Sequence, residues 1–199
     1  MDIRLLGPLE VWHEGRQLDL GGPKRRALLA VLALHSNEVV RTDRLVDELW
    51  GERAPRNAVG ALHNHVSRLR KEIGVDTVVT RPWGYVLRAD PDELDVARFE
   101  RLVADADALP AGARAAALSE ALSLWRGRAL ADLEGEPALQ IEIGRLEELR
   151  IERARTEDRC RPRAGSRGRA DRGVGGADRR APAARAASRA ADPRSLPRR

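Results

Sequence analysis

The stretch from residue 56 to residue 88 limits what this chain can fold into more than any other part of its sequence. A helix from Asn57 to Gly74 places five apolar side chains in one stripe, consisting of Val59, Leu62, Val66, Leu69 and Ile73. Its opposite side carries polar and basic side chains, namely Asn57, Asn64, Ser67, Arg68 and Lys71. Such a helix packs on a core by its apolar stripe and leaves the polar side exposed.

Two short segments with alternating apolar residues follow this helix, at residues 77–80 and 85–88. The residues between them, RPWG at positions 81–84, contain the proline and glycine of a tight turn. We therefore expect a β-hairpin with Arg81 at its tip. A helix followed directly by a hairpin is the arrangement of a winged helix-turn-helix, in which the exposed side of the helix enters the DNA major groove.

The first twenty residues predict a small antiparallel sheet. A strand at residues 3–11 is expected to bend at a bulge over residues 6–9. The sequence EGR at residues 14–16 favours a turn, and residues 17–20 favour a return strand.

Two more helices are expected before the amphipathic one. Residues 24–35 have a broad apolar face, and residues 44–50 form a shorter helix capped by Thr42 or Asp43. Sheet, three helices and terminal hairpin together predict an α+β winged helix-turn-helix at residues 1–91.

Several runs of this first part resemble one family. The runs LLGPLEV, GGPKRRALLAVLALHSNEVV, LVDELWGERAP, SRLRK and TRPWGYVL are similar to OmpR/PhoB-type winged helices, and in particular to the SARP branch of antibiotic regulatory proteins. The resemblance implies a sequence-specific DNA-binding regulator that activates a secondary-metabolite cluster. It further implies binding to direct promoter repeats as a head-to-tail dimer, and contact with RNA polymerase.

The second part, residues 94–157, has a purely helical pattern. The runs at residues 94–106, 117–133 and 136–154 resemble the opening helices of the bacterial transcriptional activator domain, a TPR-like stack of helical hairpins. Their apolar faces are supplied by Phe99, Leu102, Leu118, Leu122, Trp125, Leu133, Ile141, Leu146 and Leu149. About three repeats are normally needed for a stable stack, and this segment holds roughly half that number.

The net charge of +5 is unevenly distributed along the chain. Residues 159–199 carry 13 Arg and 3 Asp (+10), residues 1–93 carry 14 basic and 14 acidic residues (0), and residues 94–158 carry 9 and 14 (−5). The high pI is therefore no argument that the folded part binds nucleic acid. Residues 158–199 are rich in Arg, Ala, Gly and Pro, and we expect a disordered tail. Two origins stay open for it, a natural basic tail or a frameshifted, truncated family member.

The polar side of the 57–73 helix supplies the candidates for reading bases. Arginine pairs bidentately with guanine and asparagine with adenine, so Arg68 is the first candidate and Asn64 the second. The full set is Asn64, His65, Ser67, Arg68 and Lys71. Helix starts and the hairpin supply candidates for phosphate or minor-groove contacts, namely Lys24, Arg25, Thr42, Arg44, Arg56 and Arg81.

Each candidate also has a purely structural interpretation. Lys24 and Arg25 belong to a helix start that is often merely solvated. Arg70 is expected to form an internal ion pair, and Trp83 is expected to pack on the domain in preference to stacking on a sugar. The other tryptophans are expected to anchor the core, at Trp12, Trp50 and Trp125.

Catalysis, cofactors and metals have little support in this sequence. Residues 21–24 lack the spacing of a phosphate-binding loop. His63 and His65 point apart on a helix, and the single Cys160 completes no zinc pattern. No stretch is apolar enough to span a membrane, so a cytoplasmic, nucleoid-associated protein is expected. Two alternatives remain, a helical protein-interaction module whose winged helix only dimerises, and a non-functional truncated regulator.

Overall fold

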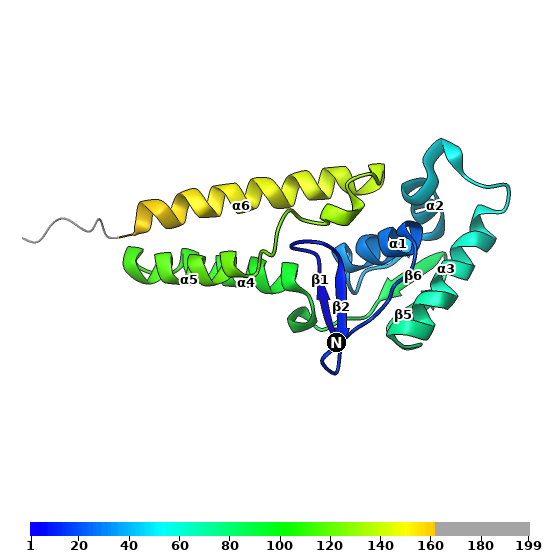
Figure 1. Ribbon diagram of the computed structural model, residues 1–199, viewed down its shortest axis with the longest axis horizontal. Helices are drawn as coiled ribbons and strands as arrows, with labels where there is room; N and C mark the ends of the chain where they lie inside the picture. The colour runs from blue at the N-terminus through cyan, green and yellow to red at the C-terminus, as the bar shows by residue number, and fades with distance from the viewer. Residues whose placement is uncertain (162–199) are drawn as a thin grey trace, which may run out of the picture. The chain divides into compact units, whose positions relative to one another are not determined.

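The computed structural model describes residues 1–161 (Figure 1). The chain begins with a three-stranded antiparallel sheet of order β1-β2-β3. Its strands are β1 (Asp2–Arg4), β2 (Glu10–His13) and β3 (Arg16–Gln17). Ile3 pairs with Val11 and Trp12 with Gln17.

The predicted single strand at residues 3–11 is wrong, because the chain reverses between β1 and β2. The carboxylate of Asp95 accepts hydrogen bonds from the backbone N–H groups of Leu5 (2.7 Å) and Leu6 (2.9 Å). These groups therefore serve a contact with a residue about 90 positions away instead of a strand ladder. The expected return strand at residues 17–20 is likewise reduced to β3.

Three helices form the body of the winged helix: α1 (Pro23–Leu34), α2 (Thr42–Trp50) and α3 (Ala58–Ile73). Seven consecutive residues of α1, from Ala27 to Ala33, are buried, so this helix lies at the centre of the core. The predicted side-chain cap of α2 is absent, since Arg41 occupies the N-cap without a side-chain hydrogen bond. The backbone N–H of Thr42 donates instead to the carbonyl oxygen of Trp83 at 2.8 Å.

The predicted stripe of α3 is confirmed except at its first position. Leu62, Val66, Leu69 and Ile73 are buried, whereas Val59 is 47% exposed at the rim of the core. Local signals set the two ends of the helix. The side chain of Asn57 accepts a hydrogen bond from the N–H of Gly60 at 3.0 Å, and Gly74 ends the helix with a φ of 100°.

The wing belongs to a second antiparallel sheet, of order β4-β6-β5. Its strands are β4 (Val40–Arg41), β5 (Val78–Arg81) and β6 (Gly84–Leu87). Arg81 pairs with Gly84, so Arg81 is the last residue of β5, and Pro82 and Trp83 form the tip. Only glycine fits at position 84, because a Cβ there would lie 2.1 Å from the carbonyl oxygen of Val40.

The helical part comprises α4 (Asp95–Asp107), α5 (Ala111–Ser123) and α6 (Gln140–Cys160). Helix α5 packs against both α4 and α6 (Figure 1). In the core of the helical part, the rings of Phe99 and Trp125 meet edge to face, with their centroids 5.5 Å apart. Short 3-10 turns occur at Gly51–Arg53, Pro91–Glu93, Ala131–Leu133 and Pro137–Leu139.

Three expectations for the helical part are wrong. The helix predicted at residues 117–133 ends at Ser123, because the N–H groups of Arg126 and Leu130 bond to the carbonyls of Leu6 and Leu5 instead of continuing it. Ile141 is 82% exposed and supplies no core face. Helix α6 extends through residues 158–160 of the predicted tail. The rest of that tail, and with it the question of its origin, lies outside the described residues.

The tryptophans differ from one another in burial. Trp125 is buried as expected, and Trp50 packs partly buried against the core. Trp12 is no core anchor, because it lies on the sheet surface with its Nε1 donating to Glu10 (2.9 Å) and the guanidinium of Arg4 5.3 Å from its ring centroid.

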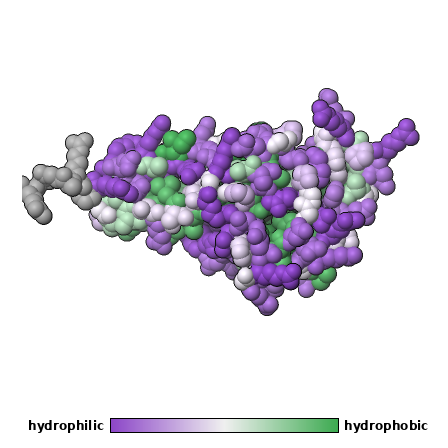
Figure 2. Space-filling model, in the orientation of Figure 1, coloured by the Kyte–Doolittle hydropathy of each residue, from purple (hydrophilic) through white to green (hydrophobic). Residues whose placement is uncertain are grey.

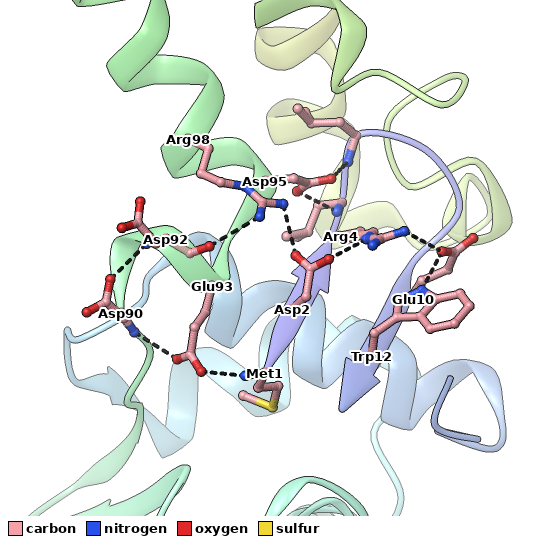
Figure 3. A network of polar contacts seen from close by, with 12 residues as sticks. Met1, Asp2, Arg4, Glu10, Trp12, Asp90, Asp92, Glu93, Asp95 and Arg98 are labelled. Carbon is pink, nitrogen blue, oxygen red and sulfur yellow. Dashed lines mark hydrogen bonds and ion pairs between the residues drawn. The ribbon is translucent and has the colours of Figure 1, made fainter. Parts of the chain in front are cut away.

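A set of polar contacts, here called the interdomain seam, joins the two parts of the described chain. Its members are Leu5, Leu6, Leu9, Lys24 and Arg26 of the winged helix and Asp95, Arg126, Asp132 and Glu136 of the helical part. Figure 3 shows Asp95 beside the neighbouring contacts of Asp2 with Arg4 and Arg98. The expected boundary at residues 91–94 therefore marks a change in secondary structure within one compact unit.

Asp95 is the most deeply buried charged residue of this seam, with 2% of its surface exposed. Burial raises the pKa of its carboxyl group, and the bonds from Leu5 and Leu6 and the charge of Arg126 oppose that rise. In residues 1–161, no helix is long and apolar enough to cross a membrane.

Candidate nucleic-acid interface

The exposed side of α3 presents the predicted base-reading residues. Asn64, Ser67, Arg68 and Lys71 are exposed, and within residues 1–161 their side chains form no hydrogen bond or ion pair. In Figure 1, α3 lies on the side of the winged helix away from α4, α5 and α6. The helical part therefore does not cover this face.

His65 differs from its neighbours because it is half-buried at the edge of this face. Its ring centroid lies 6.0 Å from that of Trp50. Burial lowers the pKa of His65, and the positive charges of Arg25 and Arg68 lower it further. A neutral imidazole is therefore favoured at neutral pH, and it offers one donor and one acceptor nitrogen.

A shallow hollow of about 250 Å³ brings two predicted groups of residues together. It is lined by Arg25, Ala61, Asn64, His65 and Arg68. Arg25 was predicted only as a phosphate contact at the start of α1, and the structure places it beside the base-reading candidates. Nothing in the sequence spacing indicated this proximity, because it depends on how α1 and α3 cross.

Several predicted phosphate contacts are engaged inside the protein. The ammonium group of Lys24 donates to the carbonyl oxygen of Leu49 and to the carboxylate of Glu136, both at 2.6 Å. Lys24 therefore belongs to the interdomain seam, a structural role that its assignment as a phosphate contact did not include.

The other phosphate candidates differ in how far they are engaged within the protein. Arg44 contacts Glu48 and His35, both at 2.6 Å, although half of its side chain stays exposed. Thr42 is half-buried, and its backbone N–H is taken by the wing. Arg56 and Arg81 are exposed and have no side-chain partner within the described part of the chain.

Arg70 has an internal role, but the ion pair predicted for it is wrong. Its guanidinium donates to the carbonyl oxygen of Val78 (2.7 Å) and to the hydroxyl of Thr80 (2.8 Å). These bonds tie α3 directly to β5 of the wing.

Trp83 contradicts the expectation that it packs on the domain. Its side chain is 83% exposed at the tip of the wing, and its φ is 70°. The face shown in Figure 2 is largely hydrophilic, and Trp83 is the most exposed of the large apolar side chains in the described part of the chain.

Two family models match the chain along most of its length. The model of "Transcriptional regulatory protein, C terminal" matches residues 15–87, and that of "Bacterial transcriptional activator domain" matches residues 94–183. The second match thus continues beyond the residues that the structure describes.

Two relatives with longer chains match about three quarters of this chain. Regulatory protein AfsR of Streptomyces griseus is 36% identical over 156 residues, which are 76% of this chain and 16% of that protein. Regulatory protein DnrI of Streptomyces peucetius is 34% identical over 172 residues, covering 76% of this chain and 61% of that protein. This chain therefore spans less than two thirds of either relative.

A solved structure of similar fold is that of Mycobacterium tuberculosis EmbR in complex with a low-affinity phosphopeptide. It superimposes with a TM-score of 0.76 and 31% sequence identity, over 80% of this chain and 45% of that one. The arrangement of winged helix and helical part is thus shared with a known regulator.

Proposed function

Because the chain belongs to the SARP-type regulators, which join an OmpR/PhoB-type winged helix to a bacterial transcriptional activator domain, we propose that it regulates transcription by reading promoter DNA with α3. The observation that carries the proposal is the division of α3 into two sides. One side is buried in the core, and the other presents Asn64 and Arg68 with no partner among residues 1–161.

The exposed side of α3 suits base recognition in the major groove. Arg68 donates two hydrogen bonds to O6 and N7 of a guanine, and Asn64 pairs bidentately with an adenine. Ser67 and Lys71 flank these contacts, and His65 reaches the wall of the groove.

Phosphate contacts fix the register of α3 on the duplex. Arg25 lies in the hollow beside Arg68, Arg56 precedes α3, and Arg81 lies at the end of β5. Since residues 1–93 carry no net charge, these local positions supply the positive field. Each phosphate that they neutralise adds about 0.9 to the slope of log affinity against log salt.

The finer features follow from the family resemblance. The protein activates a secondary-metabolite cluster, binds direct repeats as a head-to-tail pair, contacts RNA polymerase and acts at the nucleoid in the cytoplasm. The tight packing of the helical part against the winged helix supports a fixed orientation of any surface that meets the polymerase.

The test begins with duplexes that the full chain selects from a random pool. Arg68→Ala and Asn64→Ala are then compared with wild type, and Arg155→Ala, an exposed arginine of α6, is the matched control. Arg68→Ala should weaken binding to the selected duplex by about tenfold or more and relax preference at one base pair. Arg155→Ala should leave both unchanged.

Salt titration separates DNA binding from the alternative of a protein-interaction module. Binding through phosphates weakens steeply as salt rises, whereas a hydrophobic protein contact changes little. If no duplex is enriched, or if Arg68→Ala and Asn64→Ala both bind like wild type, α3 is not a recognition helix.

A further inference from the structure

The tip of the wing holds a bulky residue in a conformation that suits glycine. Pro82 and Trp83 are the two turn residues, since Arg81 pairs with Gly84. Proline fixes φ near −65°, and Trp83 has a φ of 70°. This combination is a type II turn, whose second central position favours glycine or asparagine because a Cβ is crowded there.

Contacts from three elements hold this tip in place. The carbonyl oxygen of Trp83 accepts a hydrogen bond from the N–H of Thr42 at the start of α2 (2.8 Å). Gly84 lies directly against the backbone of Val40, and Arg70 of α3 bonds to β5. The indole is therefore presented from a rigid support.

The fold gains little from this indole. With 83% of its side chain exposed, Trp83 buries almost no apolar surface to offset its crowded backbone. Strain without a stabilising return is typical of positions that serve binding. The role of Trp83 thus lies in a contact outside the described chain.

The surroundings of the indole favour DNA over a protein as its partner. The indole projects beside a small hollow of about 420 Å³ that it lines with Val46 and Val59, whereas protein-docking surfaces are contiguous apolar patches of several hundred Å². Arg81, two residues away, is exposed and has no acidic partner within residues 1–161. Asp43, the acidic residue that lines the same hollow as Trp83, is paired with Arg41. The hydrogen bond from Arg41 lowers the pKa of Asp43 to about 2, and the positive charge of Arg41 balances that of the carboxylate.

We propose that the indole of Trp83 enters the minor groove beside the major-groove site of α3 and wedges against a deoxyribose or a flexible base step. Apolar wedges of this kind unstack a step and bend the duplex. The inference rests on the proposed function and adds a second means of selection, since pyrimidine–purine steps deform most easily. Base pairs under the wing are then chosen by deformability, without hydrogen bonds.

The experiment compares Trp83→Gly and Trp83→Phe with wild type, using full-length protein and the duplexes that wild type selects. Ile141→Ala is the matched control, because Ile141 is 82% exposed on α6. Glycine relieves the crowded turn, so Trp83→Gly should melt at the same or a higher temperature. It should nevertheless bind DNA about tenfold more weakly. Trp83→Phe should recover most of the affinity, and Ile141→Ala should change neither quantity.

A fluorescent base reports the wedge itself. With 2-aminopurine placed in turn at each step flanking the α3 site, saturating wild type should raise the fluorescence at one step. Arg68→Ala at saturation should raise it as well, whereas Trp83→Gly should not.

The outcomes separate this inference from the function on which it rests. If wild type selects no duplex, both fail. If Arg68→Ala weakens binding but Trp83→Gly matches wild type in affinity and in the 2-aminopurine signal, the wedge alone is overturned. The wedge is also overturned if Trp83→Gly binds DNA normally but loses assembly with RNA polymerase, because Trp83 then serves a protein contact in the cleft that it lines with Val46 and Val59.

Discussion

The interdomain seam and the exposed face of α3 use polar side chains in opposite ways. In the seam each carboxylate meets partners, as Asp95 does with Leu5 and Leu6 and Asp132 with Leu9. On α3, Asn64 and Arg68 have no partner among residues 1–161. Partnered groups specify how the chain folds, and unpartnered groups remain available for a ligand. Residues of the same type therefore serve different ends according to the surface they occupy.

The largest effect that tests this contrast is expected at Asp95. Asp95→Ala leaves the buried N–H groups of Leu5 and Leu6 without acceptors, and each such loss costs ~1–3 kcal/mol. The free energy of unfolding, measured by urea denaturation, should fall by about 3 kcal/mol. Asp105→Ala, at an exposed position of the same helix, is the control.

If Asp95→Ala and Asp105→Ala have equal free energies of unfolding, these contacts of the seam contribute nothing to stability, and the contrast with α3 is wrong. A fragment of residues 1–91 that melts as cooperatively as the whole chain would likewise show that the seam does not stabilise the winged helix. Because that fragment lacks every acceptor from the helical part, we expect it to be largely unfolded.

Smaller effects on stability and on the salt dependence of DNA binding are expected at two adjacent residues of α1, which belong to different surfaces. Lys24 belongs to the seam and Arg25 to the hollow that it lines with Asn64 and Arg68. Lys24→Met leaves Glu136, which is 8% exposed, without its ion-pair partner. The free energy of unfolding should fall by ~1–2 kcal/mol, with no change in the salt slope of DNA binding. Arg25→Met should lower that slope by about 0.9 and change stability by less than ~0.5 kcal/mol.

Urea denaturation and salt titration of the two variants provide both readouts. The pair is its own control, because each variant removes one positive charge from the same turn of helix. If both variants lowered the salt slope equally, Lys24 would contact phosphate after all, and its place in the seam would not decide its role.

Local signals made α3 and the wing predictable from sequence. The Asn57 cap, the stop at Gly74 and the four buried positions of the stripe depend on residues within one or two turns of each other. The same periodicity placed Asn64 and Arg68 on the surface. It failed at Val59, and the separate expectation that Trp83 packs on the domain was wrong as well, because apolar character alone does not show where the core ends.

The wrong predictions at residues 3–11 and 117–133 and the unpredicted seam contacts of Lys24 have a common cause. In each, backbone or side-chain groups are bonded to partners about 90 to 125 positions away in the chain. Such partners are invisible to a pattern that compares neighbours. The part of the candidate site built by one helix was therefore predicted, and the hollow that α1 and α3 build together was not.

The smallest expected effect concerns His65, which lies between the two kinds of surface. Its pKa in the folded protein is below the ordinary value of 6.5, first because of burial and then because of Arg25 and Arg68. Protonation therefore favours the unfolded chain, and the stability that the neutral ring contributes is present above about pH 6.5 and lost as pH falls below it. The difference in free energy of unfolding between wild type and His65→Gln should shrink from about pH 7.5 to about pH 5. The trend should be weaker in an Arg25→Met background, and a trend that is unchanged there would mean that burial alone sets this pKa.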